Sequence, residues 1–273
     1  MPFNLPIAIK LGNFVQDAYA LTGTPAPASI KLTDPTFTVL DVVYGDDKWD
    51  DVDGYVPFGF IALSVAAPYT IVVSVRGTEN LWDWMADANF FRRDCPATGA
   101  PDGAETEDGF SNLYISLRTG NTPATATLKA AVQAHIAALG TANIDDVCVC
   151  GHSLGGALAT LISADICSSG VFISPTVYTF ASPAVGEKTF VSWYNGIVPD
   201  SYRIYNQPDV VPTLPPGIFG YTHVDEPYMV NSGATTQHTV ACYHSLSTYL
   251  HLLDPSIPLG ASCAILPLPA PAS

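Results

Sequence analysis

The strongest chemical signature in this sequence is a serine set between glycines. The stretch is Gly151-His152-Ser153-Leu154-Gly155, a G-x-S-x-G pattern. Residues 147–150 before it form a short apolar run typical of a strand buried on both faces, and residues 154–162 after it are good helix formers. A serine at such a strand-to-helix corner is a nucleophile elbow. We therefore predict that Ser153 is a nucleophile that attacks a carbonyl carbon.

The glycines and the helix start have physical roles at this corner. A serine lifted above a sheet on a tight turn is strained, so Gly151 and Gly155 leave room for strand and helix to approach each other. The helix that starts at Leu154 points its N–H groups toward charge that forms beside the serine. We predict that the Leu154 N–H is one oxyanion-hole donor. The alternative, a Gly-Ser loop without function, is disfavoured by the strand and helix on either side.

A serine nucleophile needs a general base and an acid that orients the base. In chains with a nucleophile elbow the acid and then the histidine follow the serine. Asp209 follows a strand predicted over residues 201–205, which places it on a loop at the carboxyl end of that strand. Asp200 precedes the same strand and would lie at the opposite edge of the sheet, and Asp225 has no comparable position. Asp209 is therefore the predicted acid.

Four histidines follow the serine: His223, His238, His244 and His251. His244 is predicted to open the last helix, so its side chain can project from a loop, whereas His251 lies deep within that helix. His238 is the competing candidate, six residues upstream of His244. The other two histidines, His135 and His152, precede or adjoin the serine and are expected to be structural. The residues alone leave the base open between His244 and His238.

Several segments, in order along nearly the whole chain, resemble the class 3 (fungal-type) lipases. They are Val75-Arg76-Gly77-Thr78, the elbow, Phe180-Ala181-Ser182-Pro183, Tyr205-Asn206-Gln207-Pro208-Asp209-Val210-Val211-Pro212 and His244-Ser245. The resemblance implies an α/β-hydrolase fold and a triad of Ser153, Asp209 and His244, which favours His244 over His238. It also implies that Thr78 is the second oxyanion donor, through its backbone N–H and hydroxyl.

Hydrophobic periodicity and turn residues predict alternating strands and helices. Predicted helices cover residues 7–19, 109–117, 123–139, 154–162, 187–194 and 244–252; predicted strands cover 37–44, 55–65, 69–75, 147–150, 176–181 and 201–205; 95–107 is a predicted loop. This order indicates a mostly parallel central sheet flanked by helices, with the active residues at the carboxyl ends of the strands. We predict a single α/β-hydrolase domain over residues 1–273.

A short helix predicted over residues 81–87 follows Thr78 directly. Its apolar residues are Leu81, Trp82, Trp84 and Met85. We expect this segment to be a mobile lid, with Leu81, Trp84 and Met85 on the side that covers the site in water and enters lipid at an oil surface. The alternative is a fixed helix packed on the core.

Composition excludes several classes of protein. Of 273 residues, 48% are hydrophobic and 13% are charged, which excludes disorder. The net charge of −15, from 25 acidic and 10 basic residues, argues against nucleic-acid binding and against electrostatic docking to anionic lipid. The uncharged stretch 56–75 contains Pro57, Gly59 and Pro68, so two strands are expected there and not a membrane span.

The cysteines and the N-terminus give further expectations. Cys148 and Cys150 alternate in the predicted buried strand and should act as small hydrophobes and not as metal ligands. The candidates for a disulfide are Cys95, Cys167, Cys242 and Cys263, and the sequence does not assign the pairing. No cleavable signal peptide is recognisable. The predicted location is therefore the cytoplasm, or outside the cell by a route that needs no signal peptide.

These features predict a serine carboxylester hydrolase that needs no metal or organic cofactor. The preferred activity is that of a lipase hydrolysing acylglycerols through an acyl-enzyme, with an oil–water interface as transient partner. Phospholipase A1, feruloyl esterase and small-ester esterase activities are the alternatives within the enzyme class, and the two lid tryptophans disfavour a sugar-ester esterase. A catalytically dead lipid-binding relative is the alternative outside it. Acyl-chain preference and oligomeric state are left open.

Overall fold

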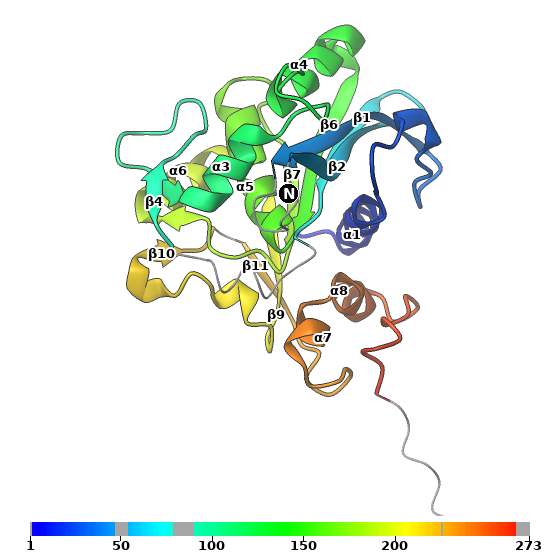
Figure 1. Cartoon of the computed structure of the whole chain (residues 1–273), viewed down its shortest axis with the longest axis vertical. Coiled ribbons are helices and arrows are strands. Elements are labelled where there is room, and N and C mark those ends of the chain that lie inside the picture. The colour runs from blue at the N-terminus through cyan, green and yellow to red at the C-terminus, as the bar shows by residue number, and fades with distance from the viewer. Residues whose placement is uncertain (1, 47–53, 79–89, 225, 266–273) are drawn as a thin grey trace, which may run out of the picture.

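The computed structural model describes residues 2–46, 54–78, 90–224 and 226–265. Its centre is a seven-stranded sheet in the order β1-β2-β3-β6-β7-β9-β11 (Figure 1). The strands are β1 (Phe37–Asp46), β2 (Tyr55–Ser64), β3 (Tyr69–Val75), β6 (Ile144–His152), β7 (Thr176–Phe180), β9 (Ser201–Asn206) and β11 (Pro227–Val230). The first three strands are antiparallel neighbours, and every pair from β3 to β11 is parallel. The prediction of a mostly parallel sheet is confirmed.

Helices cover both faces of this sheet, each with its own apolar core. The helices are α1 (Leu5–Tyr19), α3 (Asp108–Ser116), α4 (Leu128–Leu139), α5 (Leu154–Ser168), α6 (Lys188–Ile197), α7 (Val240–His244) and α8 (Leu246–Leu253). One core joins the sheet to α3, α4, α5 and α6, and the other joins it to α1 and α8. The two groups lie on opposite sides of the sheet in Figure 1. Short 3₁₀ turns are η1 (Pro27–Ser29), η2 (Thr141–Asn143), η3 (Val211–Thr213) and η4 (Gly217–Phe219).

The inner strands are buried on both faces because their residues are apolar without alternation. In β3 and β6 the register pairs Val73 with Val149, and both side chains are fully buried. Helix α5 follows β6 and packs against β6 and β7. The pairing of β6 with β3 and the packing of α5 on the sheet therefore hold the strand-to-helix corner at Ser153 in place.

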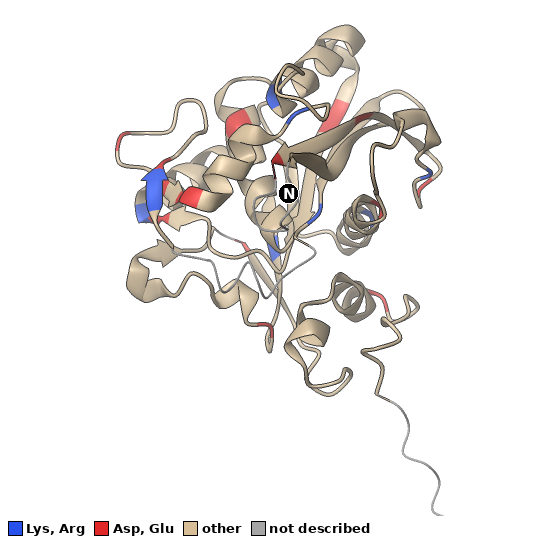
Figure 2. Cartoon of the chain, viewed as in Figure 1, with Lys and Arg blue, Asp and Glu red and all other residues tan. Residues whose placement is uncertain are grey.

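A second, four-stranded antiparallel sheet was not predicted. Its order is β10-β8-β5-β4, from β10 (Tyr221–Thr222), β8 (Gly186–Glu187), β5 (Glu105–Glu107) and β4 (Arg92–Asp94). β5 falls within residues 95–107, which we expected to be loop. Strands of two or three residues are too short to show an alternating pattern. Figure 2 shows the basic residues of β4, where Arg92 and Arg93 pair with Glu105 and Asp108, so they add no net positive surface.

Helix α4 begins five residues later than predicted. Residues 123–125 form a turn and a bend, in which the Thr125 hydroxyl donates to the Thr122 carbonyl oxygen (2.9 Å). Thr127 is the N-cap of α4, and its side chain accepts from the Ala130 N–H. The prediction that the helix starts at Thr122-Pro123 was therefore wrong, because Thr127 caps the N-terminus of the helix instead.

The last predicted helix, over residues 244–252, is divided in two. His244 is the final residue of α7, and α8 begins at Leu246. Between them Ser245 has φ −58° and ψ 129°, which is extended backbone and cannot continue a helix. The expectation that His244 opens the last helix is therefore wrong.

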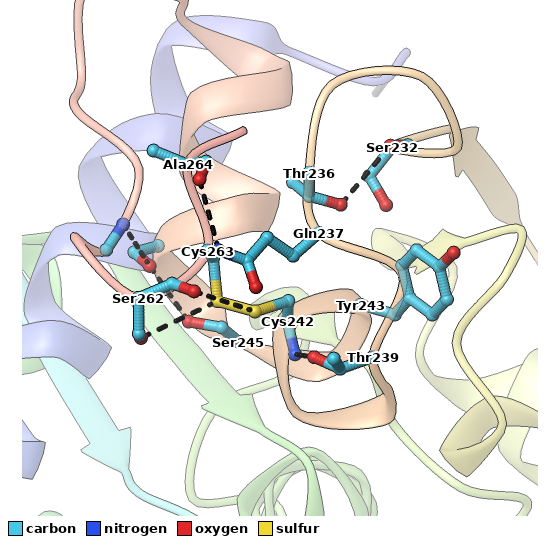
Figure 3. Close-up of a disulfide and its surroundings, with 12 residues drawn as sticks. Ser232, Thr236, Gln237, Thr239, Cys242, Tyr243, Ser245, Ser262, Cys263 and Ala264 are labelled. Carbon is cyan, nitrogen blue, oxygen red and sulfur yellow. Dashed lines mark hydrogen bonds between the residues drawn. A yellow bond between two sulfur atoms is a disulfide. The ribbon is translucent and has the colours of Figure 1, made fainter. Parts of the chain in front are cut away.

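One disulfide joins Cys242 of α7 to Cys263 (Figure 3). Cys263 follows α8, so the bond encloses His244 and the whole of α8 in one covalent loop. Cys148 and Cys150 are free thiols buried on β6, as expected of small hydrophobes. No helix among the described residues is long and apolar enough to cross a membrane.

Candidate active site

Ser153 lies at the corner between β6 and α5, in a backbone conformation with a positive φ. Its φ is 59° and its ψ −128°, a region that a residue with a side chain seldom adopts. A Cβ on Gly151 would lie 2.0 Å from the Gly155 carbonyl oxygen, and a Cβ on Gly155 would lie 2.5 Å from that of Val75. Both glycines are therefore required for the corner to close, and the predicted elbow geometry is present.

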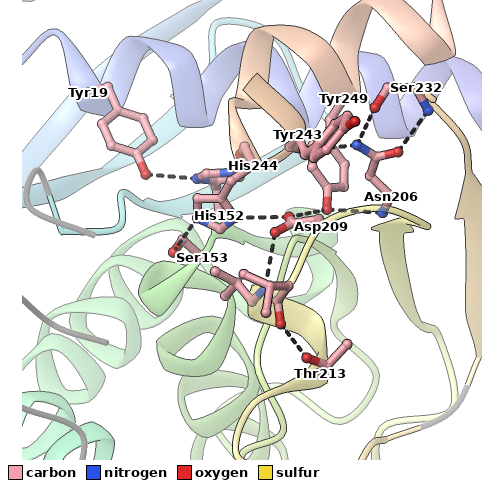
Figure 4. Close-up of polar contacts among 12 residues, drawn as sticks. Tyr19, His152, Ser153, Asn206, Asp209, Thr213, Ser232, Tyr243, His244 and Tyr249 are labelled. Atoms are coloured by element: carbon pink, nitrogen blue, oxygen red, sulfur yellow. Dashed lines mark hydrogen bonds and ion pairs between the residues drawn. The ribbon is translucent and has the colours of Figure 1, made fainter. Parts of the chain in front are cut away.

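Three side chains form a continuous hydrogen-bonded row at the carboxyl edge of the sheet (Figure 4). His244 Nε2 lies 2.8 Å from Ser153 Oγ, and His244 Nδ1 lies 2.9 Å from Asp209 Oδ2. The Asp209 side chain is fully buried and that of His244 is 8% exposed. Because a carboxylate only accepts, His244 Nδ1 carries the proton and Nε2 is left to accept from the serine hydroxyl. This is the arrangement in which a histidine can act as general base toward serine.

The Asp209 carboxylate is held by two further donors. The Tyr249 hydroxyl donates to Oδ2 (2.7 Å), and the Val211 N–H donates to Oδ1 (3.0 Å). Burial and the Asp209 charge raise the pKa of Tyr249 well above its usual value, so its hydroxyl stays protonated and donates. Tyr249 in turn accepts from the Asn206 N–H (3.0 Å). Sequence reasoning missed Tyr249, because a tyrosine within an apolar helix is typical of core packing.

The competing acids and bases lie elsewhere. His238 is exposed, with its ring 6.1 Å from that of Tyr243. Asp200 lines a cavity of about 580 Å³ together with Asp145 and Asp146, at the amino edge of the sheet, as expected from its place before β9. Asp225 lies outside the described residues.

The other histidines each bond to a group away from the serine hydroxyl. His223 Nε2 donates to the Pro212 carbonyl oxygen (2.5 Å), His251 Nδ1 to that of Ile257 (2.7 Å), and His135 Nε2 bonds to Asp41 Oδ2 (2.6 Å). His152 is buried in the elbow and bonds to the His244 carbonyl oxygen (2.8 Å). Within the described ranges, His244 is the only histidine that bonds to both Ser153 and a carboxylate. In the described parts of the chain there is no cluster of His, Cys, Asp and Glu that could hold a metal ion.

The two predicted oxyanion donors belong to different segments: Leu154 follows Ser153 in the chain, and Thr78 lies in the loop after β3. Leu154 is the first residue of α5, so its N–H belongs to the first turn, which has no partner within the helix. Thr78 is buried in the loop that follows β3. A Cβ on the neighbouring Gly77 would lie 2.9 Å from Ser153 Cβ, which shows that this loop packs directly on the elbow. The predicted lid residues Leu81, Trp82, Trp84 and Met85 lie outside the described residues, so the lid stays a prediction.

Comparison with known proteins identifies the family. The model of the family "Lipase (class 3)" matches residues 72–219, which is more than half of the chain. The chain belongs to the class 3 lipase family. The matched region contains Thr78, the elbow and Asp209, whereas His244 lies beyond it. The resemblance inferred from the sequence motifs is thereby confirmed.

The similar proteins include enzymes named as acylglycerol lipases and enzymes named as phospholipases. The secreted mono- and diacylglycerol lipase 1 of Fusarium solani is 34% identical over 163 residues, covering 60% of this chain and 44% of that protein. Phospholipase A1-IIgamma of Arabidopsis thaliana is 31% identical over 209 residues, covering 66% and 47%. The chain thus spans about half the length of the curated relatives it matches.

Solved structures support the fold. The mono- and diacylglycerol lipase of Aspergillus oryzae superimposes with a TM-score of 0.62 at 23% identity, covering 84% of this chain and 81% of that one. The likeness and the mostly parallel sheet together show the α/β-hydrolase fold.

The predicted location was wrong. We expected a cytoplasmic protein, or export without a signal peptide, because no signal peptide was recognised. The similar protein from Fusarium solani is a secreted lipase, and the start of the present sequence does not decide the route of export.

Proposed function

We propose that this protein is a serine carboxylester hydrolase, and specifically a lipase that hydrolyses acylglycerols. The observation that carries the proposal is the row from Ser153 through His244 to Asp209, with bonds of 2.8 and 2.9 Å. Membership of the class 3 lipases and similarity to a mono- and diacylglycerol lipase support the substrate class.

In the proposed mechanism Ser153 Oγ attacks the ester carbonyl while His244 Nε2 takes the hydroxyl proton. Asp209 holds the imidazole by Nδ1 and stabilises its charged form. The N–H groups of Leu154 and Thr78 bind the oxyanion of the tetrahedral intermediate. His244 then protonates the leaving glycerol oxygen, which gives an acyl-Ser153 ester. Water, deprotonated by the same nitrogen, attacks that ester, and His244 returns the proton to Ser153 Oγ as the bond between the acyl carbon and Oγ breaks and the fatty acid leaves.

The test is covalent labelling combined with replacement of the serine. An alkyl phosphonate ester should modify wild-type protein at Ser153 and abolish hydrolysis, and Ser153→Ala should lose about 10⁴- to 10⁶-fold in kcat while remaining folded. Ser163→Ala is the matched control, since Ser163 is buried within α5, the helix that Ser153 precedes, and its hydroxyl donates to the Ala159 carbonyl oxygen. Activity in Ser153→Ala comparable to that of the control would refute the assignment.

A second candidate activity is that of a phospholipase A1, favoured by the name of the similar protein from Arabidopsis thaliana. Both activities use the same triad, so they differ only in the substrate that enters the site. Rates on dioleoylglycerol and on phosphatidylcholine, measured in mixed micelles of equal composition, distinguish them. A kcat/KM at least as high on phosphatidylcholine would replace the lipase assignment.

We also propose that the protein works outside the reducing cytoplasm. The Cys242–Cys263 disulfide supports this, because such bonds persist in oxidising compartments. Mass spectrometry of protein alkylated without reduction should find both cysteines unmodified. Alkylated Cys242 and Cys263 in protein from its native source would contradict the proposal.

A further inference from the structure

A buried arginine, Arg76, hydrogen-bonds to the Gly77–Thr78 peptide, whose N–H is the proposed oxyanion donor. Arg76 is 4% exposed, and its guanidinium lies over the Phe58 ring, 4.7 Å from the centroid. Its Nε donates to the Pro57 carbonyl oxygen (3.0 Å) and its Nη1 to the Gly77 carbonyl oxygen (2.7 Å). Contacts with Pro57 and Phe58 of β2 thus hold the guanidinium in place, and the guanidinium in turn holds the position of the Gly77 carbonyl group.

That carbonyl belongs to the same planar peptide as the Thr78 N–H. This peptide is trans, since the cis bonds of the described chain are both at proline, so its C=O and N–H point in opposite directions. Holding the carbonyl of Gly77 therefore sets the direction of the Thr78 N–H. A cationic donor on the carbonyl also draws electron density from the amide and makes its N–H a stronger donor.

The other side of Gly77 is held by a tyrosine from α1. The Gly77 N–H donates to the Tyr19 hydroxyl (3.0 Å), and that hydroxyl lies 2.8 Å from His152 Nδ1. His152 Nε2 lies 2.8 Å from the His244 carbonyl oxygen, which can only accept, so Nε2 carries the proton. Burial, and then the proximity of His244, lower the pKa of His152 well below its usual value. His152 is therefore neutral, and Nδ1 accepts from Tyr19.

These bonds form one directed chain, visible in part in Figure 4. It runs from Gly77 through Tyr19 and His152 to the backbone of His244, and so joins the oxyanion loop to the base. The packing around Gly77 is close: a Cβ there would lie 2.7 Å from the Tyr19 hydroxyl and 2.9 Å from Ser153 Cβ. A small movement of Gly77 would therefore change the position of Thr78 relative to the nucleophile.

We propose that Arg76 and Tyr19 are positioning residues that hold the Thr78 N–H toward the oxyanion, one through each side of Gly77. This inference rests on the proposed function, which gives the Thr78 N–H its role. Tyr19 is the last residue of α1 and lies outside the region matched by the family model. In this proposal α1 therefore helps to shape the active site.

The first test is Tyr19→Phe, with Tyr178→Phe as matched control. Both hydroxyls anchor α1, because Tyr178 accepts from the Asn4 N–H (2.8 Å) at the other end of the helix, but only that of Tyr19 reaches Gly77. A misplaced catalytic group can cost up to about 100-fold in rate, so Tyr19→Phe should lower kcat about 10- to 100-fold with KM unchanged. Tyr178→Phe should keep the wild-type kcat.

A trifluoromethyl ketone separates positioning from general damage. It adds to the serine as a hemiketal whose oxygen occupies the oxyanion hole, so its Ki should rise in Tyr19→Phe by the factor by which kcat/KM falls. In Tyr178→Phe its Ki should stay at the wild-type value.

Arg76→Lys tests the other side, with Arg118→Lys as control. Arg118 makes the same kind of contacts away from the site: Nε donates to the Ser116 carbonyl oxygen, Nη1 to that of Pro123, and the guanidinium lies over the Tyr55 ring. Lysine keeps the charge but cannot bridge two carbonyls in a fixed plane. Arg76→Lys should lower kcat and raise the ketone Ki, and Arg118→Lys should change neither.

The outcomes separate the two proposals. Wild-type kcat and Ki in Tyr19→Phe, or equal losses in Tyr19→Phe and Tyr178→Phe, would overturn the positioning role while phosphonate labelling of Ser153 keeps the hydrolase standing. A wild-type protein that does not react with phosphonate would reject the proposed function, and the positioning role with it. If Arg76→Lys fails to fold, Tyr19→Phe decides alone.

Discussion

A partly buried histidine away from the proposed triad should make the protein lose stability in acid. His223 lies in the wall of a cavity of about 370 Å³ beside Arg203, and its Nε2 donates to the Pro212 carbonyl oxygen (2.5 Å). Burial, and then the Arg203 charge, lower the pKa of His223 to about 4, against the smaller opposing effect of the Pro212 bond. Folded protein therefore keeps this histidine neutral well below pH 6.

The sign and size of the effect follow from proton linkage. Between pH 6.5 and pH 4 the unfolded chain binds a proton at His223 and the folded chain does not, so stability falls as pH falls through this window. Above pH 6.5 both states are neutral and nothing is lost. A fall in pKa from 6.5 to about 4, at about 1.4 kcal/mol per pKa unit, corresponds to about 3 kcal/mol.

The measurement is urea unfolding of wild type and His223→Gln at intervals from pH 8 to pH 4. Glutamine cannot be protonated and retains an N–H for the Pro212 carbonyl oxygen. The free energy of unfolding of wild type relative to the variant should therefore fall by about 3 kcal/mol between pH 7.5 and pH 4. His238→Gln is the control, because His238 is exposed. A wild-type-to-variant difference that is the same at every pH would refute the reasoning.

Three further predictions concern the site and its supports. His244→Ala should lose as much activity as Ser153→Ala while His238→Ala remains active, as kcat on a soluble ester will show; the reverse result would transfer the role of base. Replacing Cys242 and Cys263 together by alanine should lower the free energy of unfolding by about 3 kcal/mol in chemical denaturation, since the bond closes a loop of 21 residues; an unchanged midpoint would contradict this. The lid predicted at residues 81–87 requires that the rate on a short triacylglycerol jump at its solubility limit and that Trp84→Ser reduce the jump; a smooth hyperbola would eliminate the lid.

The positions of the proposed nucleophile and acid were predictable because their signals are local. Ser153 stands between a strand and a helix that the sequence shows on either side, and Asp209 lies on the loop that follows β9. The parallel sheet then brings the two loops to one edge without further information. The same reasoning placed Asp200 at the opposite edge, where the structure has it.

The parts that sequence reasoning missed depend on contacts between distant segments. Tyr19 and His152 are 133 residues apart, and each alone is typical of ordinary core packing. The pairing of Cys242 with Cys263 depends on the path of the chain after α8, which no local pattern records. The break at Ser245 was missed because apolar periodicity runs through it, although an extended backbone there is what frees His244 from the helix.

The neutral state of His152 has a consequence for the proposed base. The rings of His152 and His244 lie 4.7 Å apart between centroids. Two unit charges at that distance repel by about 3.5 kcal/mol at an effective dielectric constant of 20, and His244 becomes positive when it takes the serine proton. A protonated His152 would therefore raise the free energy of the transition state by a comparable amount. Because burial lowers the pKa of His152 well below its usual value, a histidine can adjoin the nucleophile, support the backbone of the base and still leave the charge on His244 unopposed.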